Sequence, residues 1–252
     1  MAITMDARPL AAHVDEASRI VAAADAAAVT LRVTGGVGVA LRCPSAAAAP
    51  LAREYADIDA VAAGGQRREV AALFADLGYA ADEAFNALHG ETRLFFWDPA
   101  NQRQLDVFLD RVDMCHRIDL RSRLDIDRRT LSLADLLLMK LQVVETNRKD
   151  YLDMLALLAD HEWTGDEAGL NLDYLAELTA SDWGLWRTTT TVAERAASFA
   201  GELEGFAARD VVRDRVATFL GALEVSTKSR GWRMRARIGE RKRWYELPEE
   251  SH

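Results

Sequence analysis

The chain has 252 residues, of which 50% are hydrophobic and 28% are charged, so it can bury a core as one large domain or two small ones. Its formal net charge of -9 and pI near 5.1 argue against a general nucleic-acid coat or a membrane-surface protein, because both depend on distributed positive charge. Cys43 and Cys115 are too few for a disulfide framework. No apolar run approaches the roughly 18 to 20 residues of a membrane helix, and residues 1–10 lack the pattern of a secretory signal. We therefore expect a cytoplasmic protein without a membrane partner.

The first part of the chain mixes helical and strand patterns. In chain order, the sequence predicts a helix at about residues 11–29, a strand at 30–33, a helix at 37–42, a flexible insertion at 43–51, a strand at 55–61, and a helix from about 65 to 77 that Gly78 caps. Apolar runs at 94–97 and 105–109, separated by turn residues at 98–101, predict a β-hairpin.

From residue 133 onward the pattern is helical. Apolar residues recur at helical spacing over 133–144 and 151–158, and further helices are expected at 172–178, 192–206 and 211–223. Thr188 to Thr191 offer N-cap oxygens to the helix at 192–206. The expected fold class is α+β: a small mixed-sheet domain at residues 1–130, followed by a helical C-terminal region at 131–252 that carries a basic tail.

The candidate site begins with Asp57 and Asp59, which flank Ile58 in a predicted strand. Successive strand side chains point to opposite faces, so both carboxylates share one face while Ile58 lies on the other. Two acids placed side by side repel each other, and a bound divalent metal ion is the natural reason to tolerate them. Asp106, in the second strand of the hairpin, could complete a three-carboxylate site. Asp110 has the same parity and is the other candidate, but apolar neighbours on both sides favour Asp106.

A glycine pair, Gly35 and Gly36, follows the strand at 30–33. Because glycine has no Cβ, backbone N–H groups and the next helix N-terminus can approach a phosphate closely. A second Asp-x-Asp, formed by Asp125 and Asp127, has no glycine pair one helix upstream, and we expect it to lie at the surface. The combination of the glycine pair with the acids is what indicates phosphate chemistry.

These residues resemble the nucleotidyltransferase superfamily, which includes DNA polymerase β, the aminoglycoside nucleotidyltransferases and the AbiEii-type toxins of bacterial toxin–antitoxin and phage-defence systems. The family pattern is a Gly-Gly or Gly-Ser, a short helix, Asp-x-Asp on a strand and a third acid on a neighbouring strand. Residues 34–41, the tripeptide 57–59 and Asp106 resemble these parts, and residues 136–141 and 147–155 look like the helical Lys and Arg-x-x-Asp elements of the AbiEii-like branch. The insertion makes the spacing from the glycines to the acids longer than the compact family spacing.

The resemblance implies Mg²⁺-dependent transfer of a nucleoside monophosphate from a nucleoside triphosphate (NTP) to an acceptor hydroxyl of an RNA, a protein or a small molecule, a reaction compatible with a toxin or defence role. It assigns nucleotide binding to Gly35, Gly36, Lys140 and Arg148, and catalysis with two Mg²⁺ ions to Asp57, Asp59 and Asp106. The alternative is a catalytically inactive nucleotidyltransferase-fold protein that binds nucleotide or regulates. A third acid displaced from the metal pair would support that alternative.

Some of these residues also have simpler interpretations. Lys140 lies in an apolar helical stripe, where its amine either meets an anion or reaches solvent at the edge of the stripe. Arg148 and Asp150 could support a phosphate or metal, or form an ion pair at a helix start. Asp153 shares a helix face with Asp150 and is expected to be solvated.

The tail at residues 228–243 reverses the sign of the local charge. It contains six arginines and two lysines, with Trp232, Trp244 and Tyr245 among or beside them. Arginines with nearby aromatic rings can hold phosphates and stack bases, which suits an RNA acceptor or a nucleotide. Alternatively, these cations pair with the acidic excess of the first half of the chain.

Overall fold

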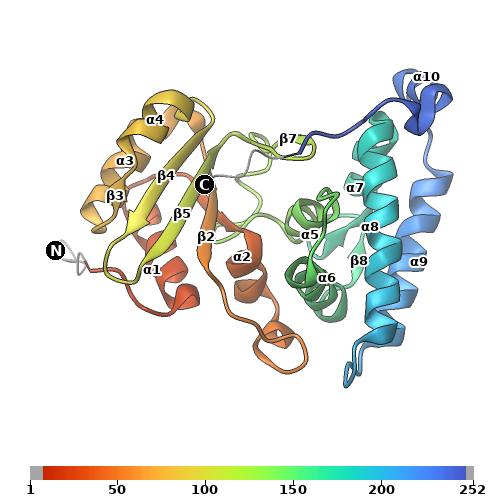
Figure 1. Ribbon diagram of the computed structural model, residues 1–252, viewed down its shortest axis with the longest axis horizontal. Helices are drawn as coiled ribbons and strands as arrows, with labels where there is room; N and C mark the ends of the chain where they lie inside the picture. Colours follow the sequence, from red (N-terminus) through yellow and green to blue (C-terminus); the bar gives the residue numbers. More distant parts are fainter. Residues whose placement is uncertain (1–7, 248–252) are drawn as a thin grey trace. The chain divides into compact units, whose positions relative to one another are not determined.

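The computed structural model describes residues 8–247, which fall into two compact units (Figure 1). Within the described residues, the first unit comprises the ranges 8–41, Glu54–Val112 and Ile118–Leu131, and the second comprises Arg42–Arg53, Asp113–Arg117 and 132–247. The expected α+β class, with a mixed sheet followed by a helical region, is confirmed. No described helix combines the length and the apolar character that crossing a membrane would require.

A five-stranded mixed sheet organises the first unit, in the order β1-β2-β5-β4-β3. Its strands are β1 (Leu31–Thr34), β2 (Asp57–Ala62), β3 (Ala80–Ala81), β4 (Arg93–Asp98) and β5 (Arg103–Leu109). β2 and β5 run parallel, and the other neighbours are antiparallel. The predicted hairpin is confirmed as β4 and β5.

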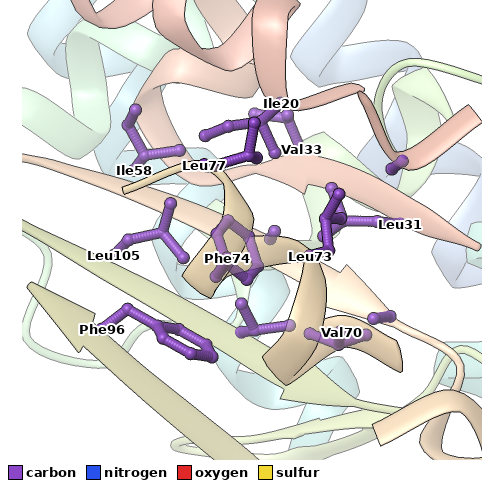
Figure 2. Close-up of a cluster of buried hydrophobic side chains, with 14 of the residues drawn as sticks. Ile20, Leu31, Val33, Ile58, Val70, Leu73, Phe74, Leu77, Phe96 and Leu105 are labelled. Carbon is purple, nitrogen blue, oxygen red and sulfur yellow. The ribbon is translucent and has the colours of Figure 1, made fainter. Parts of the chain in front are cut away.

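Two helices, α1 (His13–Ala26) and α3 (Arg67–Asp76), bury one face of this sheet. Figure 2 shows Phe74 of α3 among the sheet residues Ile58, Phe96 and Leu105, all less than 2% exposed. Burying a side chain of this size contributes about 1.5–3 kcal/mol. Because Ile58 faces this core, the alternation along β2 turns the two flanking aspartates to the opposite face, as predicted from strand parity.

Two further helices of the first unit border the sheet. α2 (Gly35–Arg42) begins directly after β1, as expected. α4 (Glu83–His89), which the sequence analysis did not predict, starts at Asp82, whose side chain accepts the N–H of Phe85. The Asn86 amide bonds both backbone groups of Phe95. It therefore satisfies the edge of β4 next to the short strand β3.

The second unit is largely helical, and its helices pack as amphipathic elements around Leu155, Val192 and Phe219, each at most 2% exposed. They are α5 (Leu133–Leu141), α6 (Arg148–Asp160), α7 (Leu172–Ser181), α8 (Trp183–Glu202), α9 (Arg209–Val225) and α10 (Arg230–Ile238). The remaining elements of the chain are short: β6 (Arg111–Asp113), β7 (Arg117–Asp119), β8 (Trp163–Thr164), β9 (Leu170–Asn171), η1 (Pro44–Ala47), η2 (Gly64–Gln66) and η3 (Gly239–Arg241).

Two local expectations are wrong. The segment 43–51 is not a loose insertion, because it forms η1 and buries Cys43, Ala46 and Leu51. The helix expected at 192–206 begins at Trp183 and is capped by Asp182, so the threonines at 188–191 lie inside α8 and not at its start. Thr188 and Thr189 are buried on its packed face, which overrides the low helix propensity of threonine.

Candidate functional site

The sheet face opposite α1 and α3 gathers three acids from two neighbouring strands. Asp59 and Asp106 are direct register partners across the parallel pair β2–β5, and Asp57 precedes Asp59 on the same face. Asp57 is exposed, Asp59 is half-buried, and Asp106 is buried. Asp110 lies beyond the end of β5, where its φ is 64° and its carboxylate accepts the Gly64 N–H. The structure thus places Asp106, rather than Asp110, beside the pair.

Gly35 lies directly against the Asp59 carboxylate. A Cβ built on Gly35 would come within 2.1 Å of Asp59 Oδ2, and the φ of Gly35 is +61°. Both the contact and the backbone conformation therefore require glycine here. Gly36 follows as the second residue of α2, so the glycine pair forms the N-terminal turn of a helix that starts at an acid of the candidate site.

Two residues beside the acids were not singled out by the sequence analysis. Thr34 is the register partner of Asp59 on β1, and its hydroxyl is buried without a hydrogen-bond partner among the described residues. His13 is bonded to the backbone of Ala56; desolvation, followed by the positive charge of Arg103, lowers the pKa of this histidine. Its Nε2 is also buried and unpaired within the described part of the chain. Thr34 directly precedes the glycine pair, which is the only sequence signal for its position.

Asp106 is bound by an arginine from the neighbouring strand. Arg93 of β4 donates from Nε to Oδ1 at 2.7 Å and from Nη2 to Oδ2 at 2.9 Å. The Arg93 guanidinium also lies 5.6 Å from the ring centre of Phe85 and 5.0 Å from that of Phe108. The two hydrogen bonds and the two cation–π contacts together fix the orientation of the Arg93 guanidinium. The sequence analysis missed Arg93.

The donor set fits a small, hard cation at Asp57 and Asp59. Mg²⁺ is usually held by one or two carboxylates together with substrate phosphates and waters. The Thr34 hydroxyl, which has no hydrogen-bond partner among the described residues, lies beside Asp59, where it could donate to a phosphate oxygen. Over residues 8–247, however, no group of three or more His, Cys, Asp or Glu side chains is arranged to hold a metal.

Lys140 and Arg148 belong to the second unit. Lys140 pairs with Asp150 at 3.1 Å and with Asp153 at 2.9 Å. Burial alone would lower the pKa of Lys140, but these two carboxylates outweigh it and raise that pKa. The expectation that Asp153 is solvated is wrong, because it is 3% exposed and also binds Arg53 through both oxygens.

At the start of α6, Arg148 and Asp150 have separate partners and do not form the helix-start ion pair considered above. Asn147 and Asp150 form a capping box, so Asp150 serves the helix N-terminus as well as Lys140. Arg148 lies 5.4 Å from the ring centre of Phe199. A cation–π contact therefore accounts for the position of Arg148.

The basic tail folds into α10 and η3 against its own unit. Arg235 lies 4.6 Å from the ring centre of Trp183, and Trp244 donates from its indole to Thr188. The single acid of the tail, Glu240, pairs with Arg187. Six cations remain exposed: Arg230, Arg233, Arg237, Arg241, Lys242 and Arg243. In the described part of the chain, none of these six forms an ion pair.

The second Asp-x-Asp lies in turns rather than in a strand. Asp125 is exposed, and Asp127 accepts the backbone N–H groups of Arg129 and Thr130. This is ordinary turn chemistry, in which an aspartate bonds the backbone two or three residues ahead. The surface location expected for this copy is confirmed for Asp125, while Asp127 is partly buried.

The fold and the acidic face define an α+β protein whose sheet presents carboxylates beside a glycine-initiated helix. No family model matches the chain, and no curated protein matches it. Among solved structures, the chain is similar to the solution structure of the antibiotic-resistance factor ANT(2'')-Ia, with 16% identity and a TM-score of 0.37. That match covers 84% of this chain and 94% of the other. The function proposed below is supported by the chain's own residues.

Proposed function

We propose that the protein is a Mg²⁺-dependent nucleotidyltransferase that moves a nucleoside monophosphate from an NTP to an acceptor hydroxyl. The observation that carries this proposal is the contact between Gly35 and Asp59, which joins the glycine-initiated helix to the acidic strand. A helix N-terminus favours phosphate, and two carboxylates favour a divalent cation that phosphate also binds. The two parts of the site therefore suit one ligand, a metal-bound triphosphate.

In this reaction the acceptor oxygen forms a bond to the α-phosphorus while the bond from that phosphorus to the β-bridging oxygen breaks. Pyrophosphate leaves, and the acceptor proton passes to a carboxylate or to water. A bound Mg²⁺ supplies positive charge for the phosphates. Asp57 and Asp59 would hold it, while the N–H groups of Gly35 and Gly36 and the Thr34 hydroxyl would orient the triphosphate. The further roles that the resemblance implies for Asp106, Lys140 and Arg148 stay predictions.

The proposal is tested by replacing each acid of β2. We expect Asp57→Asn and Asp59→Asn to lose Mg²⁺-dependent NTP binding in calorimetry, because each removes a charge and a metal ligand. We also expect both variants to lose transfer of label from an α-labelled NTP to RNA, protein or small-molecule fractions. Asp125→Asn, in the turn copy of the tripeptide, is the matched control and should bind normally. Undiminished binding by Asp57→Asn and Asp59→Asn would contradict the assignment.

The Arg93–Asp106 pair favours a second candidate, a nucleotide-binding or regulatory module without transfer activity. In that case the third acid of the face serves an internal ion pair. The labelling experiment separates the two candidates. Label in any acceptor fraction supports transfer, whereas metal-dependent binding with no label in all three fractions supports the binding module.

We further propose that RNA is the acceptor and that the exposed side of α10 binds its phosphates. Arg230, Arg233 and Arg237 recur at helical spacing of three and four residues, so they follow one side of α10. All three are exposed, and the remaining helix side packs through Trp232 and Arg235. Arginine suits this role because its planar guanidinium binds phosphate through two N–H groups.

This proposal predicts salt-dependent binding of a labelled single-stranded RNA. Replacing Arg230, Arg233 and Arg237 together with glutamine should weaken binding and reduce the salt slope by about 0.7 for each RNA phosphate that the protein no longer neutralises. The matched control removes three exposed arginines elsewhere in the second unit, Arg117, Arg209 and Arg213. Equal losses of affinity in both triple variants, or binding to anionic vesicles but not to RNA, would contradict an RNA site on α10.

A further inference from the structure

The sheet face that carries Asp57, Asp59 and Asp106 also carries a positively charged side chain, Arg93. Arg93 binds Asp106, to which the resemblance assigns a second metal ion. Asp106 is the register partner of Asp59, so its carboxylate is the one placed to share a metal with the β2 pair. Both of its oxygens instead accept hydrogen bonds from Arg93, at 2.7 and 2.9 Å. In this bidentate pair, the Arg93 guanidinium already supplies the positive charge that a metal ion would otherwise bring to Asp106.

Arg93 is held where it is by more than Asp106. Its guanidinium also contacts the rings of Phe85 from α4 and Phe108 from β5. Phe85 also contacts Phe95, with ring centres 5.7 Å apart, which fixes it to β4. A second metal ion at Asp106 would have to displace an arginine anchored by a carboxylate and two aromatic rings.

The same guanidinium keeps donors for another anion. Arginine has five N–H groups, and Asp106 uses the one on Nε and one on Nη2. The other three have no hydrogen-bond acceptor among the described residues, and the Arg93 side chain is 30% exposed. By strand alternation, Arg93 lies on the face that carries Asp57 and Asp59, opposite its core-facing neighbour Leu94.

We propose that the site binds a single divalent metal ion, on Asp57 and Asp59, and that Arg93 takes the place of the second. Asp106 then acts as a positioning residue that orients Arg93 toward the phosphates. The inference rests on the proposed metal site of Asp57 and Asp59. It differs from the two-metal arrangement that the resemblance implies, and it agrees with the absence of a three-ligand cluster among residues 8–247.

Mn²⁺ binding to the protein alone tests the inference without any turnover, by electron paramagnetic resonance of the unbound ion. The wild type should bind one Mn²⁺ per chain, Asp59→Asn should bind none, and Asp106→Asn should still bind one. Arg93→Gln should gain a second Mn²⁺, because it releases the Asp106 carboxylate. Arg93→Gln combined with Asp106→Asn should return to one.

Arg117→Gln, which removes an exposed arginine from an ion pair of the second unit, is the charge-matched control and should leave the count at one. Thermal unfolding identifies any variant that is not folded. For the folded proteins, the number of Mn²⁺ ions bound by Arg93→Gln is compared with the number bound by the wild type. Two Mn²⁺ ions on the wild type, reduced to one by Asp106→Asn, would overturn the inference and leave the proposed function intact. No Mn²⁺ on the wild type would also overturn the inference, while the proposed function is decided separately by the calorimetry with NTP and Mg²⁺.

Discussion

Gly35→Ala is expected to destabilise the first unit by about 2–4 kcal/mol and to abolish metal-dependent nucleotide binding. Two costs add here. An alanine held at a φ of +61° is strained, and its Cβ would approach Asp59 Oδ2 to 2.1 Å. Since the glycine backbone cannot retreat without disturbing α2, we expect the Asp59 carboxylate to move, and with it a ligand of the proposed metal. Hydrogen exchange of the β1 and β2 amides measures the destabilisation.

Gly65→Ala is the matched control for this change. A Cβ on Gly65 would meet nothing within 4 Å, and Gly65 is not among the described glycines with positive φ. Its replacement should alter stability by no more than about 0.5 kcal/mol. Adding Asp59→Ala to Gly35→Ala removes the clashing oxygen but keeps the backbone strain, so the coupling between the two changes isolates the contact. A Gly35→Ala protein as stable as Gly65→Ala would refute the close approach.

The sequence predicted the acidic face because strand alternation is a local property. Asp57, Ile58 and Asp59 are neighbours in the chain, and the buried Ile58 decides which way both acids point. The position of Asp106 beside Asp59 required one more step, the pairing of β2 with β5, for which the sequence offered only the resemblance, with its third acid on a neighbouring strand.

Arg93 could not be found in the same way. In the β4–β5 pairing, Asp106 lies opposite Phe95, and Arg93 lies opposite Phe108. Arg93 and Asp106 are therefore diagonal neighbours and not direct register partners. A one-residue change in that register would turn Arg93 to the other face. The partners of Asp153 show the same difficulty. Helical spacing predicts which residues lie near Asp153 on α6, but it cannot predict the contact with Arg53, which is 100 positions away in the chain.

The largest expected effect in the second unit concerns Asp153. Its carboxylate is 3% exposed and joins two cations, Lys140 at 2.9 Å and Arg53 at 2.8 and 2.9 Å. Asp153→Ala would remove the carboxylate that binds Arg53 through both oxygens and would leave Lys140, in a largely buried place, with Asp150. Removing one partner of a buried ion pair typically costs about 3–5 kcal/mol, because the remaining charge has lost its solvation and its counter-ion. We expect a loss of that size for the second unit.

Denaturant unfolding followed by tryptophan fluorescence measures this loss, because Trp97 is the one tryptophan of six that lies outside the second unit. Asp113→Ala is the control: its partner Arg117 is exposed, and exposed pairs contribute at most about 1 kcal/mol. Asp153→Asn, which keeps the shape and removes the charge, should fall between the two. Equal midpoints for Asp153→Ala and Asp113→Ala would show that the network does not stabilise the fold. A large difference would mean that Lys140 is held primarily by protein carboxylates, so that any phosphate it binds must compete with Asp150 and Asp153.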